Sequence, residues 1–209
     1  MNEISATENK NFNPTQFYER IAQEYPEEEI NKNSPSQIAL DTFVYRYLNS
    51  INGSLLDFGC GKGRFSCYYT RGPVVGIDIA SSNISACESR CPGKDKTFLG
   101  QDITSGFNIG TFDNIICIEV LEHIPQWGEV VNNMYRSLNP NGTILITTPN
   151  KGKGWIKNKV LETYGIKDVY YHGGYSIDEM INKFIGKFKV KEKGMVPNVN
   201  KIFVKLVKI

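Results

Sequence analysis

The sequence predicts an α/β fold in which a doubly wound, mostly parallel sheet is covered by helices on both faces. From residue 54 onward, short apolar segments alternate with segments of helical pattern, and this alternation is typical of parallel sheets. The continuous apolar run from Ile115 to Ile118 indicates a strand that is buried on both faces. A length of 209 residues suits one domain of this class better than two.

Two helices are expected before the sheet begins. The first runs from Phe17 to about Tyr25, and Pro26 breaks it because proline cannot continue a helix. In the second helix, Ser34 is the expected N-cap and Pro35 the first helical residue, a position that tolerates proline. Residues 1–12 are polar and are expected to form a flexible tail.

The remaining elements follow from the change of period along the chain. The expected strands are Leu55–Phe58, Val74–Asp78, Thr97–Leu99, Phe112–Ile118, Gly142–Thr148, Phe188–Lys193 and Ile202–Lys208. The expected helices between them are Gly63–Tyr69, Ser81–Arg90, Trp127–Leu138 and Ser176–Phe184. The last helix carries a capping box, with Ser176 as N-cap and Glu179 three residues later.

Composition excludes several classes of protein. Apolar residues make up 40% of the chain and charged residues 22%, which permits a packed core and argues against a disordered regulator. The sequence has no apolar run of the roughly 20 residues that a membrane-spanning helix needs. The polar N-terminus lacks the pattern of a secretory signal. We therefore expect a cytoplasmic protein without a membrane span.

The five cysteines and the lysine-rich C-terminal part do not indicate a functional site. The number of cysteines is odd and no pair has C-x-x-C spacing, so reduced thiols are expected instead of a disulfide framework or a zinc site. Residues 1–150 have a net charge of −6 and residues 151–209 of +8. We interpret this excess as a solvated lysine-rich face, and a nucleic-acid partner is not expected.

A glycine-rich turn carries the first functional signal. Gly59, Gly61 and Gly63 follow the strand that contains Asp57 and precede a helix. Glycines allow a tight turn and a close approach of the backbone to a ligand, and the helix that follows directs free N–H groups toward it. Such a turn alone is a weak signal, because dinucleotide-binding proteins and phosphate-binding loops contain similar ones.

Two further acids make the signal more specific. Asp78 ends the next strand, where it can accept hydrogen bonds from a ribose diol. Asp102 follows the third strand, where it can meet an adenine amino group or form a turn. The Lys-Ser/Thr pair of a nucleotide P-loop does not follow the glycines.

With these residues the sequence resembles the class I S-adenosylmethionine-dependent methyltransferases. The matching segments, in family order, are Leu55–Gly63, Gly76–Asp78, Gln101–Ile103, Phe112–Ile118, Glu119–Ile124 and Leu138–Thr143. The resemblance implies a Rossmann-like, seven-stranded sheet whose last strand is antiparallel, with an N-terminal helical lid. It also implies one methyltransferase domain over residues 1–209, with a tail and lid (1–35), a cofactor-binding core (36–150), and a substrate-side insertion with closing strands (151–209).

The resemblance implies S-adenosylmethionine as cofactor, with S-adenosylhomocysteine as product. Asp57 and the glycine turn would hold the methionine part, Asp78 the ribose, and Asp102 the adenine. The full set of implied cofactor contacts is Tyr18, Tyr25, Asp57, Phe58, Gly59, Cys60, Gly61, Gly63, Asp78, Ile79, Asp102, Ile103 and Glu119. For the two tyrosines, plain packing is an equal alternative.

The two histidines are candidates for catalysis. His123 and His172 can each take the proton of an acceptor hydroxyl, and a structural role stays open for both. Similar sets bind a divalent ion such as Mg²⁺ or Mn²⁺ in some family members, where Glu119, Glu122, His123 and His172 correspond. In other members the Glu-His pair binds no metal and orients the cofactor loop.

The acceptor is the least defined part. We expect a small-molecule hydroxyl, first on a sugar or glycan, because a histidine base and a metal that binds adjacent hydroxyls suit it. A quinol or phenol is the second expectation, and the 2′-oxygen of RNA the third. A non-catalytic cofactor-binding partner subunit and a nicotinamide-dependent oxidoreductase remain open alternatives. The sequence does not indicate the oligomeric state.

Overall fold

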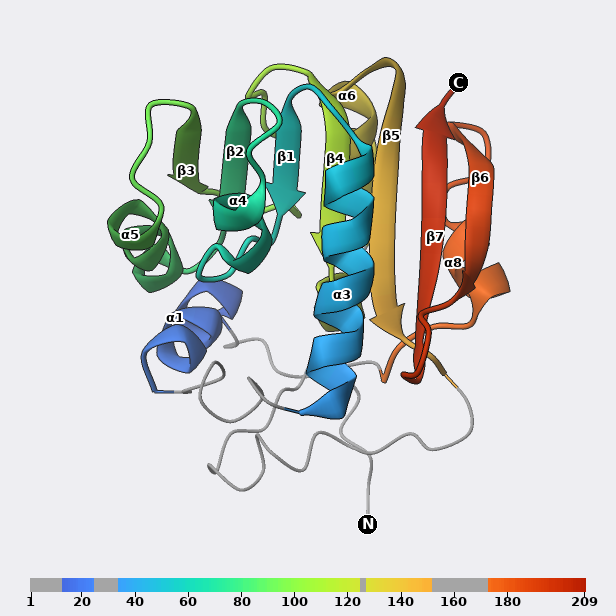
Figure 1. The fold of residues 1–209 in the computed structure, drawn as a ribbon, viewed down its shortest axis with the longest axis horizontal. Coiled ribbons are helices and arrows are strands. Elements are labelled where there is room, and N and C mark those ends of the chain that lie inside the picture. Colours follow the sequence, from blue (N-terminus) through green and yellow to red (C-terminus); the bar gives the residue numbers. More distant parts are fainter. Residues whose placement is uncertain (1–12, 25–33, 125–126, 152–172) are drawn as a thin grey trace.

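The computed structural model describes residues 13–24, 34–124, 127–151 and 173–209 (Figure 1). The described helices are α1 (Pro14–Glu24), α3 (Pro35–Ser50), α4 (Arg64–Tyr68), α5 (Ser81–Arg90), η1 (Leu121–His123), α6 (Gly128–Arg136) and α8 (Ile177–Asn182). The strands are β1 (Leu55–Phe58), β2 (Val74–Asp78), β3 (Lys96–Gly100), β4 (Phe112–Ile118), β5 (Leu138–Pro149), β6 (Phe188–Met195) and β7 (Lys201–Lys208).

The strands form one seven-stranded sheet in the order β3-β2-β1-β4-β5-β7-β6. The strands β1 to β5 pair in parallel, and β7 is antiparallel to both β5 and β6. The order reverses between β1 and β4, so the carboxyl ends of these two strands border a crevice in which ligands of open α/β sheets bind. The predicted fold class is confirmed, including the antiparallel last strand.

Helices α3, α4 and α5 cover one face of the sheet, toward the viewer in Figure 1. Leu40, Val44 and Leu48 of α3 recur at helical spacing and pack against Leu55 and Ile116 of the central strands. Each of these five side chains is buried. Burying apolar surface at about 25 cal/mol per Å² is the main stabilisation of this layer.

Helices α6 and α8 cover the opposite face (Figure 1). Val130 and Met134 of α6, with Met180 of α8, pack against Ile115 and Ile144. Because successive strand residues point to opposite faces, Ile115 and its neighbour Ile116 belong to different cores. This explains the continuous apolar run that predicted a doubly covered strand.

Most predicted elements are present with small shifts of their ends. The capping box of α8 is confirmed, with Ser176 and Glu179 satisfying each other's backbone N–H groups. The predicted start of β5 at Gly142 was wrong, because pairing begins at Leu138 opposite Phe112, before a register irregularity in β4. Among the described residues, no helix is long and apolar enough to span a membrane.

The prediction of reduced thiols throughout was wrong. A disulfide joins Cys67 to Cys91, whereas Cys60, Cys87 and Cys117 are buried thiols. Helix α4 and the end of α5 pack on the same face, so the two Cα atoms lie 5.2 Å apart, within the usual range for a disulfide. This proximity comes from tertiary packing and leaves no mark in the cysteine spacing.

Candidate cofactor and active site

The glycine turn after β1 has the geometry that its sequence predicts. Gly59, Gly61 and Gly63 have φ values of 71°, 52° and 83°, in the left-handed region that favours glycine. A Cβ added at Gly59 would lie 2.5 Å from a methyl group of Val120, whereas one added at Gly61 would meet none of the described residues within 4 Å. The turn therefore packs tightly against the segment after β4, and the described residues leave the space beside Gly61 open.

Asp57, in β1, is bonded to the helix that follows the glycine turn. Its side chain is buried and accepts a hydrogen bond of 2.6 Å from the Ser66 hydroxyl in α4. Burial raises the pKa of Asp57 to about 7, although the Ser66 bond opposes the rise. At neutral pH this carboxyl is close to half-protonated, and a nearby cationic group would ionise it.

Asp78 links the turn to the start of α5. Its carboxylate accepts bonds from the backbone N–H of Gly61 (2.9 Å) and Ala80 (2.9 Å) and from the amide of Asn83 (3.1 Å). Burial raises the pKa of Asp78, and the bonds to its charged form oppose this. Among the described residues, Oδ2 accepts one hydrogen bond, from Gly61. A carboxylate oxygen has two acceptor sites, so the residue fits the predicted contact with a ribose hydroxyl.

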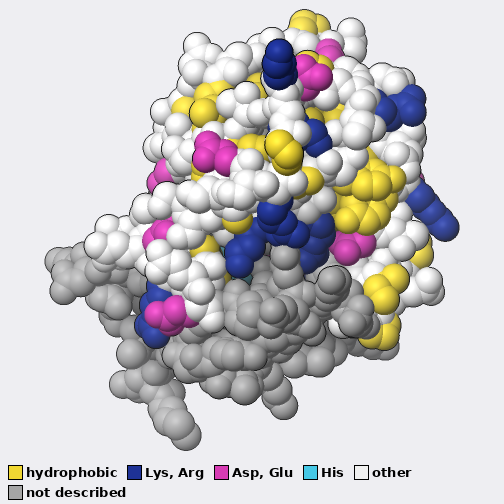
Figure 2. Space-filling view, turned by 60° about the vertical axis from the view of Figure 1, so that its left-hand side comes forward, with side chains coloured by type: hydrophobic (Ala, Val, Ile, Leu, Met, Phe, Trp, Pro, Cys, Tyr) yellow, Lys and Arg dark blue, Asp and Glu magenta, His cyan; other side chains and the backbone are white. Residues whose placement is uncertain are grey.

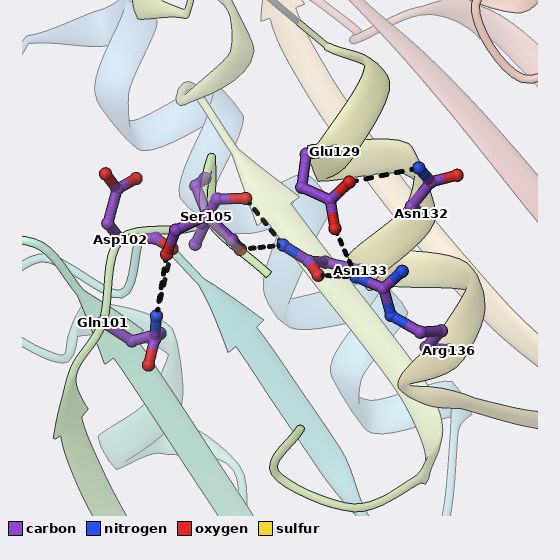
Figure 3. A network of polar contacts seen from close by, with 8 residues as sticks. Gln101, Asp102, Ser105, Glu129, Asn132, Asn133 and Arg136 are labelled. Carbon is purple, nitrogen blue, oxygen red and sulfur yellow. Dashed lines mark hydrogen bonds and ion pairs between the residues drawn. The ribbon is translucent and has the colours of Figure 1, made fainter. Parts of the chain in front are cut away.

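Asp102 and Ile103 lie in the loop after β3. The Asp102 carboxylate accepts bonds from the backbone N–H (2.8 Å) and hydroxyl (2.7 Å) of Thr104, so it forms the turn that the sequence left as an alternative. In Figure 3 it points away from the polar network below the loop. Ile103 is buried. A turn residue with an outward carboxylate is compatible with an adenine contact.

A network on α6 holds this loop, and sequence reasoning missed it. The amide of Asn133 donates to the carbonyl oxygens of Ile103 (2.9 Å) and Ser105 (2.7 Å). Arg136 bonds to both Asn133 and Glu129 at 2.5 Å (Figure 3). Asn133 is fully buried, so the network fixes the backbone that carries the predicted adenine contacts. Asn133 is a polar residue on an otherwise apolar face of α6, and this pattern could have indicated the network from the sequence.

Glu119 follows β4 directly and has an unusual backbone conformation. Its φ of 58° is in the left-handed region, which is costly for a residue with a side chain. One carboxylate oxygen accepts a bond of 3.0 Å from the Thr147 hydroxyl, and the other pairs with the ammonium group of Lys201 on β7. Glu119 is thus held by β5 and β7 at the mouth of the crevice.

Glu122 and His123 follow in the short helix η1. Glu122 is 2% exposed, and its Oε2 has no hydrogen-bond partner among the described residues. Burial, followed by the negative charge of Glu119, raises the pKa of Glu122 to about 8. The Nε2 atom of His123 lies 3.9 Å from the Glu122 Oε1 atom, so the two side chains form a carboxyl–imidazole pair that is too far apart for a direct hydrogen bond.

Helix α1 brings Tyr18 to this pair. The Tyr18 and His123 rings meet edge to face, with centroids 6.1 Å apart. Glu19 fastens the helix to the start of α5, where its carboxylate accepts bonds from the Ser81 hydroxyl (3.0 Å) and from the backbone N–H and hydroxyl of Ser82. These bonds lower the pKa of Glu19 to about 2. Glu19 was not predicted, because its partners are distant in sequence.

The structure brings together only part of the predicted site. Phe58, Cys60 and Ile79 lie at the ends of β1 and β2, beside the glycine turn. Tyr25 and His172 lie outside the described residues, so their predicted roles stay predictions. Among residues 13–24, 34–124, 127–151 and 173–209, no three His, Cys, Asp or Glu side chains are arranged to hold a metal ion. The predicted metal set depends on His172 and stays untested.

Comparisons with known proteins agree with this geometry. A family model described as a methyltransferase domain matches residues 56–146. The ubiquinone biosynthesis O-methyltransferase of Albidiferax ferrireducens is 30% identical over 104 residues, which are 46% of this chain and 41% of that protein. The corresponding enzyme of Idiomarina loihiensis is 26% identical over 167 residues, covering 73% of this chain and 68% of that protein. The chain thus spans less than half of the first relative.

Solved structures show the same fold. The N-methyltransferase NodS from Bradyrhizobium japonicum, in complex with S-adenosyl-L-homocysteine, has a TM-score of 0.71 at 16% identity and covers 93% of this chain and 97% of its own. A putative methyltransferase in complex with the Haloferax volcanii activator Trm112 also has a TM-score of 0.71, at 13% identity, over 91% of this chain and 97% of its own. Residues 56–146 therefore match a methyltransferase domain, and the chain shares the fold of these two methyltransferase structures.

Proposed function

We propose that the chain transfers the methyl group of S-adenosylmethionine to a hydroxyl oxygen of a small molecule, and that the acceptor is a quinol or phenol. The observation that carries the proposal is the carboxyl–imidazole pair Glu122–His123 beside the cofactor turn. The curated relatives support an aromatic hydroxyl, since they are ubiquinone biosynthesis O-methyltransferases. This moves the quinol or phenol ahead of the sugar or glycan that the sequence analysis placed first.

The cofactor would be held by residues around the crevice. The turn from Gly59 to Gly63 and Asp57 suit its methionine part, Asp78 its ribose, and the Asp102–Ile103 loop its adenine. When bound, the cofactor supplies a methyl group on a positively charged sulfur, which an oxygen nucleophile attacks in line. The half-protonated Asp57 can ionise next to the methionine ammonium group, and Asp78 Oδ2 has an acceptor site for a ribose hydroxyl.

His123 is the proposed general base. It takes the acceptor hydroxyl proton onto a ring nitrogen, and Glu122 stabilises the resulting imidazolium ion. Burial raises the pKa of Glu122 to about 8, and the positive charge of a protonated His123 lowers it, so proton uptake by His123 favours the ionised form of Glu122. Tyr18 packs edge-on against the imidazole ring and restricts its rotation, so the base keeps one orientation.

The test measures binding and turnover separately. Calorimetric titration with S-adenosylmethionine and S-adenosylhomocysteine, with Mg²⁺ or with EDTA, measures cofactor affinity. A labelled methyl donor is then offered with a catechol-type quinol, a simple phenol, a methyl glycoside and an RNA oligonucleotide. We expect binding of both cofactor forms and methylation of the quinol or phenol. Turnover only on the glycoside or RNA would overturn the acceptor assignment.

A variant tests the role of the base. His123→Ala should lower kcat by about 10²- to 10⁴-fold, the usual contribution of general base catalysis, while the affinity for S-adenosylhomocysteine changes little. Asp178→Asn, at an exposed position in α8, is the matched control and should leave both quantities unchanged. Equal losses of kcat and affinity in His123→Ala would indicate a structural role. Cofactor binding without turnover on any acceptor would support a non-catalytic partner subunit.

A further inference from the structure

Four of the five cysteines gather behind the glycine turn. Cys60 lies in the turn, Cys67 in α4, Cys87 in α5, and Cys91 directly after α5. A Cβ atom added at Gly63 would lie 2.9 Å from the Cys67 sulfur, 3.0 Å from that of Cys87 and 3.3 Å from that of Cys91. Three sulfur atoms, two of them joined in the disulfide, therefore surround one backbone position of the turn.

The remaining thiols connect this cluster to the cofactor residues. Cys87 and Cys60 both direct their sulfur atoms at the carbonyl oxygen of Gly61, at 3.2 Å and 3.6 Å. The N–H group of the same glycine donates to Asp78. One residue of the turn thus joins the sulfur cluster to the carboxylate that we assign to the ribose.

The disulfide lies close to the surface, with the Cys91 side chain buried. A pocket of about 260 Å³ opens beside Cys91, between the end of α5 and strand β3, and is lined further by Glu88, Lys96 and Phe98. Cys67 is half-buried. Figure 2 turns this side of the molecule forward, and its described surface mixes basic, acidic and hydrophobic side chains. A small dithiol can enter such a pocket.

We propose that Cys67 and Cys91 form a redox-active site that a dithiol reductant opens, and that opening it lowers the affinity of the neighbouring turn for the cofactor. A thiolate of the reductant attacks the Cys91 sulfur, and the bond to Cys67 breaks with the electron pair on Cys67, which takes up a proton. The second thiolate of the reductant then releases Cys91 and closes a disulfide in the reductant. Two electrons and two protons pass to the protein.

The physical link is the lack of space around Gly63. Bonded sulfur atoms are about 2.0 Å apart, whereas non-bonded heavy atoms need about 3.5–4.0 Å. Reduction therefore pushes the two sulfur atoms apart by about 1.5 Å or more, at a place where even one carbon atom added to Gly63 would lie only 2.9 Å and 3.3 Å from them. Gly63 and Gly61 must move, and the bond between Gly61 and Asp78 moves with them.

The first measurement counts thiols in the whole, unfolded protein. After exposure to an oxidised dithiol, three cysteines should be alkylated without reductant and five with it. Peptide mapping should find the bond between Cys67 and Cys91. Five reactive thiols after oxidation, or a bond to Cys60 or Cys87, would overturn the proposal. This measurement does not depend on the proposed methyltransferase function.

The second measurement titrates S-adenosylhomocysteine into the oxidised and reduced forms, and it rests on the proposed cofactor. We expect reduction to lower the affinity for S-adenosylhomocysteine by about fivefold or more. A factor of about five is at the lower end of typical coupling between two sites. Cys67→Ala removes one of the two sulfur atoms and with it the crowding, so it should bind like the oxidised form and stop responding to reductant. Cys117→Ala, whose thiol lies in β4 outside the cluster, should keep the response. Equal affinity of the two wild-type forms would overturn the coupling, and no binding by either form would contradict the proposed function instead.

Discussion

The buried Asp57 makes a sharp prediction about stability against pH. In the folded state its carboxyl has a pKa of about 7, because burial disfavours the charge. An unfolded chain ionises this group near 3.8. Between these two pH values the folded protein binds more protons than the unfolded chain, so stability falls as pH rises. The loss is complete above pH 7.

The magnitude follows from the separation of the two pKa values. About three pH units at about 1.4 kcal/mol each correspond to about 4 kcal/mol of unfolding free energy. Asp57→Asn removes the titration, and the amide oxygen can still accept the bond from Ser66. We therefore expect the variant to be as stable as the wild type near pH 4 and up to about 4 kcal/mol more stable at pH 8.

The assay is urea unfolding followed by tryptophan fluorescence between pH 4 and pH 9. Asp78 and Glu122 also have raised pKa values, but both remain in the variant, so the difference between the two curves isolates Asp57. Asp178→Asn, at an exposed carboxylate, is the control and should follow the wild type. Parallel curves for wild type and Asp57→Asn would refute the reasoning.

Three other substitutions test separate contacts. Asp78→Asn should weaken S-adenosylhomocysteine binding about 10- to 100-fold, the worth of one charged hydrogen bond, and unchanged affinity in calorimetry would contradict the ribose assignment. Glu19→Ala should release α1 at a cost of about 1 kcal/mol and speed tryptic cleavage at Arg20; an unchanged cleavage rate would show that other contacts hold the helix. Asn133→Ala should cost about 1–3 kcal/mol in urea unfolding, because two buried carbonyl groups lose their donor, whereas Asn132→Ala should cost much less; equal costs would disprove the loop-holding role.

Features that depend on neighbouring residues could be predicted from the sequence. The capping box of α8 needs only Ser176 and Glu179 three positions apart. The glycine turn needs residues that tolerate positive φ, and the three predicted glycines have it. The two-sided burial of β4 followed from its apolar run. Local sequence patterns therefore predicted the helices and strands and the glycine turn that borders the crevice.

Contacts between distant segments could not be predicted in this way. Glu119 pairs with Lys201, which lies 82 positions later, and Asn133 reaches back 30 positions to Ile103. The spacing of cysteines likewise gave no sign that α4 and α5 would bring Cys67 and Cys91 together. The contact of Glu119 depends on the order of the strands in the sheet, and the other two depend on which helix packs on which face of it; single residues encode neither choice.

The left-handed backbone at Glu119 has a consequence for sequence variation. A side chain in this conformation costs about 1–2 kcal/mol that glycine would avoid. Glycine at position 119 would thus relax the backbone and at the same time remove the carboxylate that Lys201 and Thr147 hold at the crevice. Selection for thermal tolerance would favour glycine here, and selection for turnover would favour glutamate. A library randomised at this single codon and sorted under each regime would therefore separate foldability from catalysis.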